Sequence, residues 1–220
     1  MIPIDRPYTR VNDLAKKDKS GYTSPDEYNR HIRDAQNILM SFYIDQLERH
    51  QKVPENLNPF IKRTDILELD GPKFPMPTDY RYTLEVYSGY WTLTDEGKAA
   101  INVSTVSYVG PDEVGRRRSS KIRKTPFYYY EGNQLWIENG EVGQLRYIRK
   151  APPAVYGYTE DTENDRIVFD TGSSTDLEWL EQDETNIIDI LLFMKGIETK
   201  DNSLIQWVAG KKQMYEPLNR

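Results

Sequence analysis

The chain has 220 residues, of which 37% are hydrophobic, 29% are charged and 12% are aromatic, and this composition excludes collagen-like, low-complexity and fully disordered classes. It has no cysteine and only two histidines, which excludes disulfides, thiolate catalysis and cysteine-type zinc sites. The net charge is −6, but six of the 29 basic side chains lie between residues 116 and 124, so the rest of the chain carries 23 basic against 35 acidic side chains, or −12.

Residues 1–23 are predicted to form an extended arm, because Pro3, Pro7 and Gly21 interrupt a stretch that has no sustained apolar period. The first residues also lack the basic stretch and apolar core of a signal peptide. No apolar run approaches the roughly 18 residues that a membrane span requires. We therefore expect a soluble chain that makes no membrane contact and is not exported by a signal peptide.

A long helix is predicted over residues 24–53, and its start has the strongest local signal in the sequence. Ser24 is placed as the N-cap, Pro25 as the first helical residue and Glu27 as the partner in a capping box. The helix should end near His50, before Pro54. Apolar residues recur at helical spacing along it: Tyr28, Ile32, Ala35, Leu39 and Phe42. This stripe favours either a contact with another subunit or packing against the protein's own sheet.

A β-domain is predicted over residues 57–175. Its expected strands are residues 66–69, 80–91, 99–109, 127–130, 134–138, 144–150 and 166–169. The turn signals Glu131-Gly132-Asn133 and Asn139-Gly140, together with a strand spacing of about ten residues, indicate antiparallel hairpins in a small sandwich or barrel.

The basic cluster is predicted to lie in a mobile loop, residues 110–126, between two strands of this domain. Its six cations are Arg116, Arg117, Arg118, Lys121, Arg123 and Lys124. Such a run repels itself, and its natural partners are phosphates or an acidic protein surface. A solvated hairpin tip is the alternative interpretation.

The final segment, residues 176–220, is predicted to hold two helices and a tail. The acidic run Asp183-Glu184 precedes the apolar helix 187–195, which Gly196 should close. A second helix is expected over about 201–213. The predicted fold class is therefore α+β, with a long N-terminal helix, a central antiparallel sandwich or barrel, two C-terminal helices and an extended terminal arm.

No motif predicts catalysis or a cofactor. Glycine-rich phosphate loops and a Gly-x-Ser-x-Gly elbow are absent from the sequence. Carboxylate pairs for a two-carboxylate hydrolase are available, with no feature that selects among them: Asp161, Glu163, Asp165, Asp176, Glu178 and Glu181. We expect a protein that is not an enzyme and that has no cofactor and no metal site.

Several segments resemble a known class of proteins. The run Phe74-Pro75-Met76-Pro77-Thr78-Asp79-Tyr80 is similar to the entry to the β-domain of adaptor and neck proteins of tailed bacteriophages. The run 124–137, with Arg146-Tyr147-Ile148-Arg149, resembles the later strands of that domain. The closing pattern around Trp179, Gly196 and Trp207 is similar to the C-terminal helices of ring proteins in crAss-like, podovirus-type phages.

This resemblance implies a virion structural protein: a head-to-tail adaptor of about twelve copies that forms a ring under the portal, around the channel through which genomic DNA leaves. The expected partners are further copies, the portal protein, other neck or tail ring proteins and non-specifically contacted DNA, with assembly in the host cytoplasm. Tyr28, Ile32, Leu39 and Phe42 are the candidate subunit contacts, and the basic loop is the candidate partner or DNA contact. The alternative is a glycan-binding or receptor-binding β-module of a phage tail, to which the tyrosines and tryptophans would contribute flat stacking surfaces.

Overall fold

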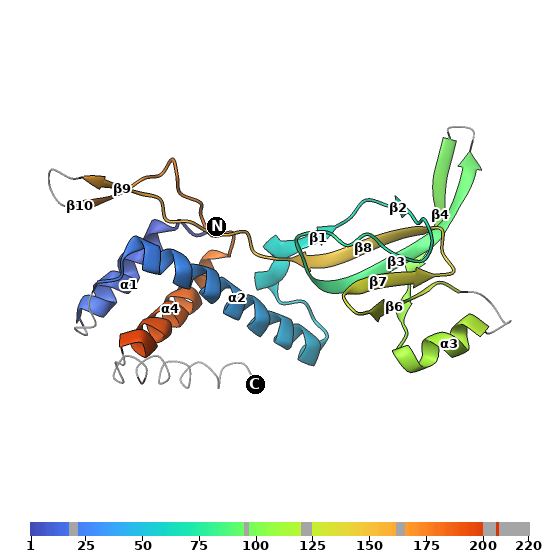
Figure 1. The fold of residues 1–220 in the computed structure, drawn as a ribbon, viewed down its shortest axis with the longest axis horizontal. Coiled ribbons are helices and arrows are strands. Elements are labelled where there is room, and N and C mark those ends of the chain that lie inside the picture. The colour runs from blue at the N-terminus through green and yellow to red at the C-terminus, as the bar shows by residue number, and fades with distance from the viewer. Residues whose placement is uncertain (18–21, 95–96, 120–124, 162–165, 200–205, 207–220) are drawn as a thin grey trace. The chain divides into compact units, whose positions relative to one another are not determined.

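The computed structural model describes residues 1–17, 22–94, 97–119, 125–161, 166–199 and 206 (Figure 1). The chain divides into two compact units. The helical unit combines residues 1–59 with residues 151–220, and the β unit is residues 60–150. The α+β class is confirmed. Among the described residues, no helix has the length and apolar character needed to cross a bilayer.

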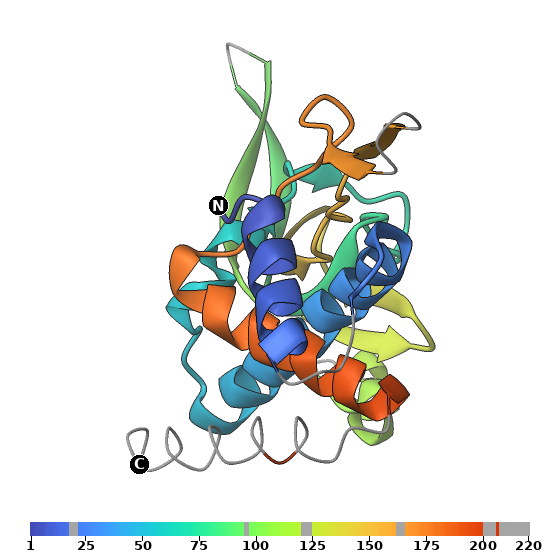
Figure 2. The same ribbon diagram turned by 90° about the vertical axis from the view of Figure 1, so that its left-hand side faces the viewer.

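Three helices of the helical unit pack on one another (Figure 2). The elements of this unit are α1 (Asp5–Lys17), α2 (Pro25–His50), the 3-10 helices η1 (Glu55–Phe60) and η2 (Glu181–Asp183), the antiparallel hairpin β9 (Tyr158–Asp161) and β10 (Arg166–Phe169), and α4 (Glu184–Thr199). Tyr28 and Ile32 of α2 lie in the core with Trp179, all without solvent exposure. The helices α1 and α2 therefore depend on a segment more than a hundred residues away in sequence.

The predicted extended arm is wrong, because residues Asp5–Lys17 form α1. Tyr8, Val11 and Ala15 are buried on one side of this helix, at spacings of three and four residues. Pro7 does not prevent the helix, since it lies in the first turn, where backbone N–H groups have no helical partner.

The long helix α2 is confirmed, with the capping box between Ser24 and Glu27. It ends at Gln51, which adopts a left-handed conformation with φ of 53° and donates its backbone N–H to the Leu47 carbonyl at 2.8 Å. Of the two alternatives for the apolar stripe, packing on the protein's own sheet differs from the structure, in which the buried side of α2 lies against α4. An apolar stripe predicts that one side of a helix is buried, but it does not identify the element that covers that side.

The β unit consists of two sheets and one helix. The larger sheet has the order β1 (Ile61–Arg63), β8 (Val142–Arg149), β3 (Tyr80–Thr94) and β4 (Gly97–Thr105), with β2 (Leu67–Glu68) also paired to β8. The smaller sheet has the order β5 (Ser107–Tyr108), β6 (Phe127–Glu131) and β7 (Gln134–Glu138), and α3 (Pro111–Ser119) connects β5 to β6. All described strand pairs are antiparallel except β5 with β6, which is parallel because α3 carries the chain back.

The two sheets form a sandwich and not a closed barrel. Val86 of β3 and Leu145 of β8 meet Leu135 and Ile137 of β7 in one apolar core, together with the fully buried Phe74. The consecutive strands β7 and β8 lie in different sheets, so the Asn139-Gly140 turn connects two layers instead of forming a hairpin.

A two-stranded ribbon extends from the larger sheet. The pairing of β3 with β8 ends at Gly89, and beyond that point Tyr90–Thr94 pairs with β4 only, as far as the described residues show. We call the paired residues 90–94 and 97–101 the ribbon. Leu93 near its tip is 86% exposed, so the ribbon has little core of its own.

The predicted boundary of the β-domain, 57–175, differs from the structure, which assigns residues 151–175 to the helical unit. Strands β1 and β9 were not predicted.

At the C-terminus α4 is confirmed, but it continues past Gly196 to Thr199, so Gly196 is not its end. The second predicted helix, 201–213, lies outside the described residues except for Gln206.

Two glycine substitutions should have opposite effects on stability. A Cβ at Gly143 would lie 2.9 Å from atoms of both Ile137 and Phe74, so Gly143→Ala overpacks the sandwich core and should lower the free energy of unfolding by about 1–3 kcal/mol. A Cβ at Gly115, on the exposed side of α3, meets nothing within 4 Å, so Gly115→Ala should raise helix stability by about 0.5–1 kcal/mol. Urea denaturation of both variants measures the difference, and equal effects would contradict this account of the core.

Candidate interaction surface

Part of the predicted basic loop, residues Pro111–Ser119, is a helix, α3. Pro111 begins α3, Asp112 and Glu113 lie in its first turn, and three arginines lie in its last turn. This arrangement matches the helix dipole at both ends. Val114 anchors the helix to the smaller sheet, where it packs against the cluster that contains Phe127. The loop prediction is therefore wrong for residues 111–119.

Arg118 is held by the fold. Its Nε donates to the Glu138 carboxylate at 3.0 Å, and its guanidinium also bonds the Tyr129 hydroxyl and lies 5.3 Å from the centre of that ring. The hydrogen bond that Arg118 donates to Glu138 raises the pKa of Arg118 above its ordinary value. This side chain attaches α3 to the sheet and is not the one to expect in a partner contact.

Arg116 and Arg117 have weaker attachments. Arg117 lies 3.8 Å from the Glu113 carboxylate and 6.0 Å from the centre of the Phe127 ring. Arg116 is exposed and makes no side-chain hydrogen bond or ion pair with any residue that the structure describes. The other three predicted contact residues, Lys121, Arg123 and Lys124, lie outside the described residues.

The predicted subunit contacts on α2 separate into two groups. Tyr28, Ile32 and Leu39 are buried inside the helical unit, so the prediction that they contact another subunit is wrong. Phe42 is 52% exposed, and Ile38, one turn before it, is 48% exposed. The sequence analysis placed Phe42 in the same stripe as the buried residues, although its spacing of four residues from Ile38 indicates a second, outward stripe.

A mixed apolar and acidic surface follows from this second stripe. Asp34, Ile38, Phe42 and Asp45 succeed one another at spacings of four, four and three residues, and all are exposed. We call these four residues the α2 outer face. Neither carboxylate has a hydrogen bond or ion pair within the described part of the chain. Arg30 and Arg49 lie about one turn beyond its two ends.

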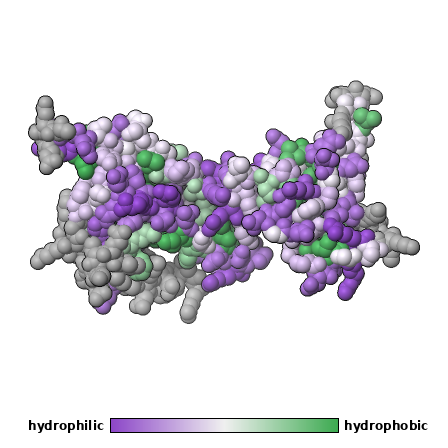
Figure 3. Space-filling view, in the orientation of Figure 1, coloured by the Kyte–Doolittle hydropathy of each residue, from purple (hydrophilic) through white to green (hydrophobic). Residues whose placement is uncertain are grey.

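The two units carry different net charges. The β unit has 14 basic and 12 acidic side chains, or +2, and the helical unit has the remaining 15 basic and 23 acidic side chains, or −8. On the face shown in Figure 3, hydrophilic residues cover most of the described surface of each unit, and hydrophobic residues form small separate patches. A partner that binds this face would therefore meet mostly polar groups and a few apolar side chains.

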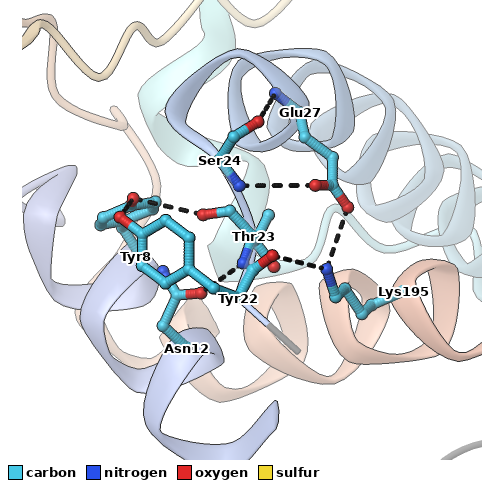
Figure 4. Close-up of polar contacts among 7 residues, drawn as sticks. All are labelled: Tyr8, Asn12, Tyr22, Thr23, Ser24, Glu27 and Lys195. Carbon is cyan, nitrogen blue, oxygen red and sulfur yellow. Dashed lines mark hydrogen bonds and ion pairs between the residues drawn. The ribbon is translucent and has the colours of Figure 1, made fainter. Parts of the chain in front are cut away.

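A partly buried cluster connects α1 and α4 to the start of α2 (Figure 4). The Lys195 ammonium, whose side chain is 5% exposed, lies 3.1 Å from the Glu27 carboxylate and donates to the Tyr22 carbonyl at 3.3 Å. From the other side, Asn12 of α1 accepts the Thr23 backbone N–H at 2.7 Å. Glu27 thus belongs both to the capping box and to an ion pair, so this cluster holds the beginning of α2 in place.

A buried carboxylate lies at the beginning of α4. Asp183 has no solvent exposure, and its Oδ1 accepts the Tyr43 hydroxyl at 2.6 Å and the Asn56 amide at 2.7 Å. Its Oδ2 has no hydrogen-bond partner among the described residues. Removal from water raises the pKa of Asp183, although hydrogen bonds from Tyr43, Asn56 and Asn186 act in the opposite direction.

A depression of about 360 Å³ in the helical unit is lined by Asp5, Arg6, Thr9, Arg10 and Glu184. Both arginines lie 3.3 Å from the Glu184 carboxylate, so the arginines that line the depression are already paired. Among the described residues, no group of three or more metal-ligating side chains is close enough to hold an ion.

The described carboxylates named for a hydrolase lie in the helical unit. Asp176 accepts the Ile4 backbone N–H at 3.0 Å, Glu181 lies 3.6 Å from Arg6, and Asp161 lies on β9. Glu163 and Asp165 lie outside the described residues.

The sequence was compared with known proteins. No protein-family model matches it, and a search of curated proteins finds no match.

The pair of Lys195 and Glu27 should be energetically coupled. Lys195→Met leaves the Glu27 carboxylate without its cation and should lower the free energy of unfolding by about 2 kcal/mol. In a Glu27→Gln background, which keeps the capping box, the same change should cost at least about 0.5 kcal/mol less. Urea denaturation of the four proteins gives the coupling energy. Additive effects would show that the ion pair contributes nothing to this cluster.

Asp183 should make stability depend on pH. Because its pKa is raised in the folded protein, the folded state binds a proton that the unfolded state has lost above its ordinary pKa of about 4. This carboxyl therefore favours folding less as pH rises through the window between the two pKa values. Asp183→Asn should raise the free energy of unfolding by about 1 kcal/mol at pH 8 and less at pH 4. Denaturation at both values measures the effect, and an equal shift at both would contradict the assignment.

Proposed function

We propose that this chain is a virion structural protein, a subunit of an oligomeric ring that connects the capsid portal to the tail of a bacteriophage and surrounds the DNA channel. It acts by assembly and not by catalysis. About twelve copies make the ring, and it assembles in the host cytoplasm with portal and neck or tail proteins. The sequence resemblance around Phe74–Tyr80 and residues 124–137 suggests this function.

The ribbon is the observation that carries the proposal. It continues β3 and β4 beyond the sheet, and a two-stranded ribbon without a covering layer has marginal stability in water. Its strand β4 is also the last strand of the sheet as described, so its outer edge offers backbone N–H and C=O groups for pairing. A projection of this kind can be stabilised by pairing with a neighbouring subunit.

The charge of the helical unit supports a passive role toward DNA. A net charge of −8 on this unit repels phosphates. A channel lined by such surfaces would let DNA slide through without being held. The basic side chains of α3 are too few, and Arg118 is engaged by Glu138, so this helix is not suited to binding a duplex along its length.

A glycan-binding or receptor-binding β-module is the second candidate. Tyr108 is 53% exposed, and its ring centre lies 5.6 Å from that of Tyr128 and 6.4 Å from that of Tyr130. A group of rings at a sheet surface can stack on a flat sugar face. Calorimetric titration with sugars, compared between wild type and Tyr108→Ala, tests this. Binding that depends on Tyr108 would favour the module.

Native mass spectrometry with negative-stain imaging tests the ring. The purified chain, alone and mixed with portal protein from the same phage, should give a closed ring with a central hole wide enough for duplex DNA. A chain that stays monomeric alone and joins no portal or tail assembly would refute the proposed function.

Shortening the ribbon should abolish the ring without unfolding the subunit. Residues 91–100 can be replaced by Asn-Gly, because Tyr90 and Ile101 are paired and a two-residue turn can join them. We expect loss of ring assembly with a change of less than about 1 kcal/mol in the free energy of unfolding, because the ribbon adds little buried area.

The β9–β10 hairpin provides a matched control. Asp161 and Arg166 are paired in the same way, so Asn-Gly can replace residues 162–165. This variant should still form rings. Rings of normal size from the ribbon-shortened protein would show that the ribbon is not an assembly element.

A further inference from the structure

We propose that the α2 outer face of one copy binds Arg116 and Arg117 on α3 of the next copy. This deepens the proposed function, on which it rests, because it assigns one of the contacts between neighbouring subunits. The contact joins the helical unit of one copy to the β unit of another.

The α2 outer face has the chemistry of an arginine-binding surface. Phe42 and Asp45 are three residues apart, and Asp34 and Ile38 are four apart, so each carboxylate has an exposed apolar side chain beside it. A guanidinium stacks on an aromatic ring and pairs with a carboxylate through a planar fork, whereas its methylene stem covers apolar surface. Two such pairs along one helix suit two arginines.

Two of the arginines on α3 are available for this contact. Of the three arginines at the end of α3, Arg118 is occupied by Glu138 and Tyr129, whereas Arg116 has no partner among the described residues. Arg117 has only the 3.8 Å contact with Glu113 and the distant Phe127 ring. Moving Arg117 to a carboxylate of a neighbour therefore costs little, since exposed pairs on one helix contribute only about 0.3–0.5 kcal/mol.

A second copy is the occupant that the charges favour. The helical unit carries −8 and the β unit carries +2, so unlike units of two copies attract each other while two helical units repel. The two surfaces are different patches of one chain, and a contact between different patches is heterologous. Heterologous contacts close into rings when the rotation permits. Nucleic acid is less suited to this surface, because Asp112 and Glu113 lie on the same short helix.

A charge exchange between two variants tests the contact. Arg116→Glu with Arg117→Glu makes α3 acidic, and Asp34→Arg with Asp45→Arg makes the α2 outer face basic. In each variant alone, the α2 outer face and α3 then carry charges of the same sign and repel each other at every contact. Each variant should therefore self-associate at least tenfold more weakly than wild type. An equimolar mixture should recover association, because the two variants can alternate around a ring. Sedimentation velocity and native mass spectrometry would show complexes with equal numbers of the two.

The control changes charge by the same amount elsewhere in the helical unit. Asp13→Arg with Glu160→Arg alters two exposed carboxylates on α1 and β9 that have no ion pair among the described residues, and it should associate as wild type does. Thermal unfolding of each variant shows whether the subunit remains folded. A mixture that stays dissociated, or a control as impaired as the basic variant, would overturn the inference.

Two further outcomes separate this contact from other possibilities. If the acidic α3 variant loses binding to duplex DNA but still self-associates normally, α3 is a nucleic-acid contact and the inference fails. A wild-type chain that does not self-associate at low salt also overturns it. The proposed function fails on a different result, namely that assembled rings, with or without this contact, do not bind portal or tail proteins.

Discussion

The helical unit depends on contacts between the beginning of the chain and the residues that follow the β unit in sequence. Ile2 and Leu177 exchange two backbone hydrogen bonds, at 2.9 and 3.0 Å, and Lys195 reaches the first turn of α2. Between these partners lies the whole β unit. The entropic cost of closing a long loop grows only slowly with its length, so the inserted residues 60–150 cost the helical core little beyond what a shorter loop would. Tyr43 of α2 and Trp179, whose ring centres lie 6.1 Å apart, come together only after this closure.

The β unit fixes a highly charged helix, α3, at its surface. Val114 provides one apolar anchor, and the pairing of Arg118 with Glu138 neutralises one of three adjacent cations. Because the anchor and this ion pair fix the orientation of α3, the cations that remain are presented in a defined direction. An arginine cluster on a mobile loop would have to lose conformational entropy on meeting a partner, and α3 has already lost most of it.

Elements whose signals lie in neighbouring residues were predicted correctly from the sequence. Predictions were wrong where a residue far away in the sequence determines the structure. The capping box at Ser24 and the strands 134–138 and 166–169 depend on neighbours in sequence, and they were placed correctly. Pro7 was read as a breaker, because nothing local shows that Tyr8, Val11 and Ala15 will be covered. The basic run was read as a loop because Glu138, which neutralises Arg118, is 20 residues away. The two stripes of α2 were merged because hydrophobicity does not distinguish an inward from an outward apolar residue.

The pairing of β1 with β8 has a consequence for how such a protein can change during evolution. Ile61 is paired with Ile148, so the chain enters and leaves the β unit on adjacent strands, about 5 Å apart. A cassette with neighbouring ends can be acquired, lost or exchanged by recombination at a single surface junction, without redesign of the frame that receives it. A lineage could therefore retain the helical frame and its partners while replacing the module between them, and each replacement would bring a new surface to an old scaffold.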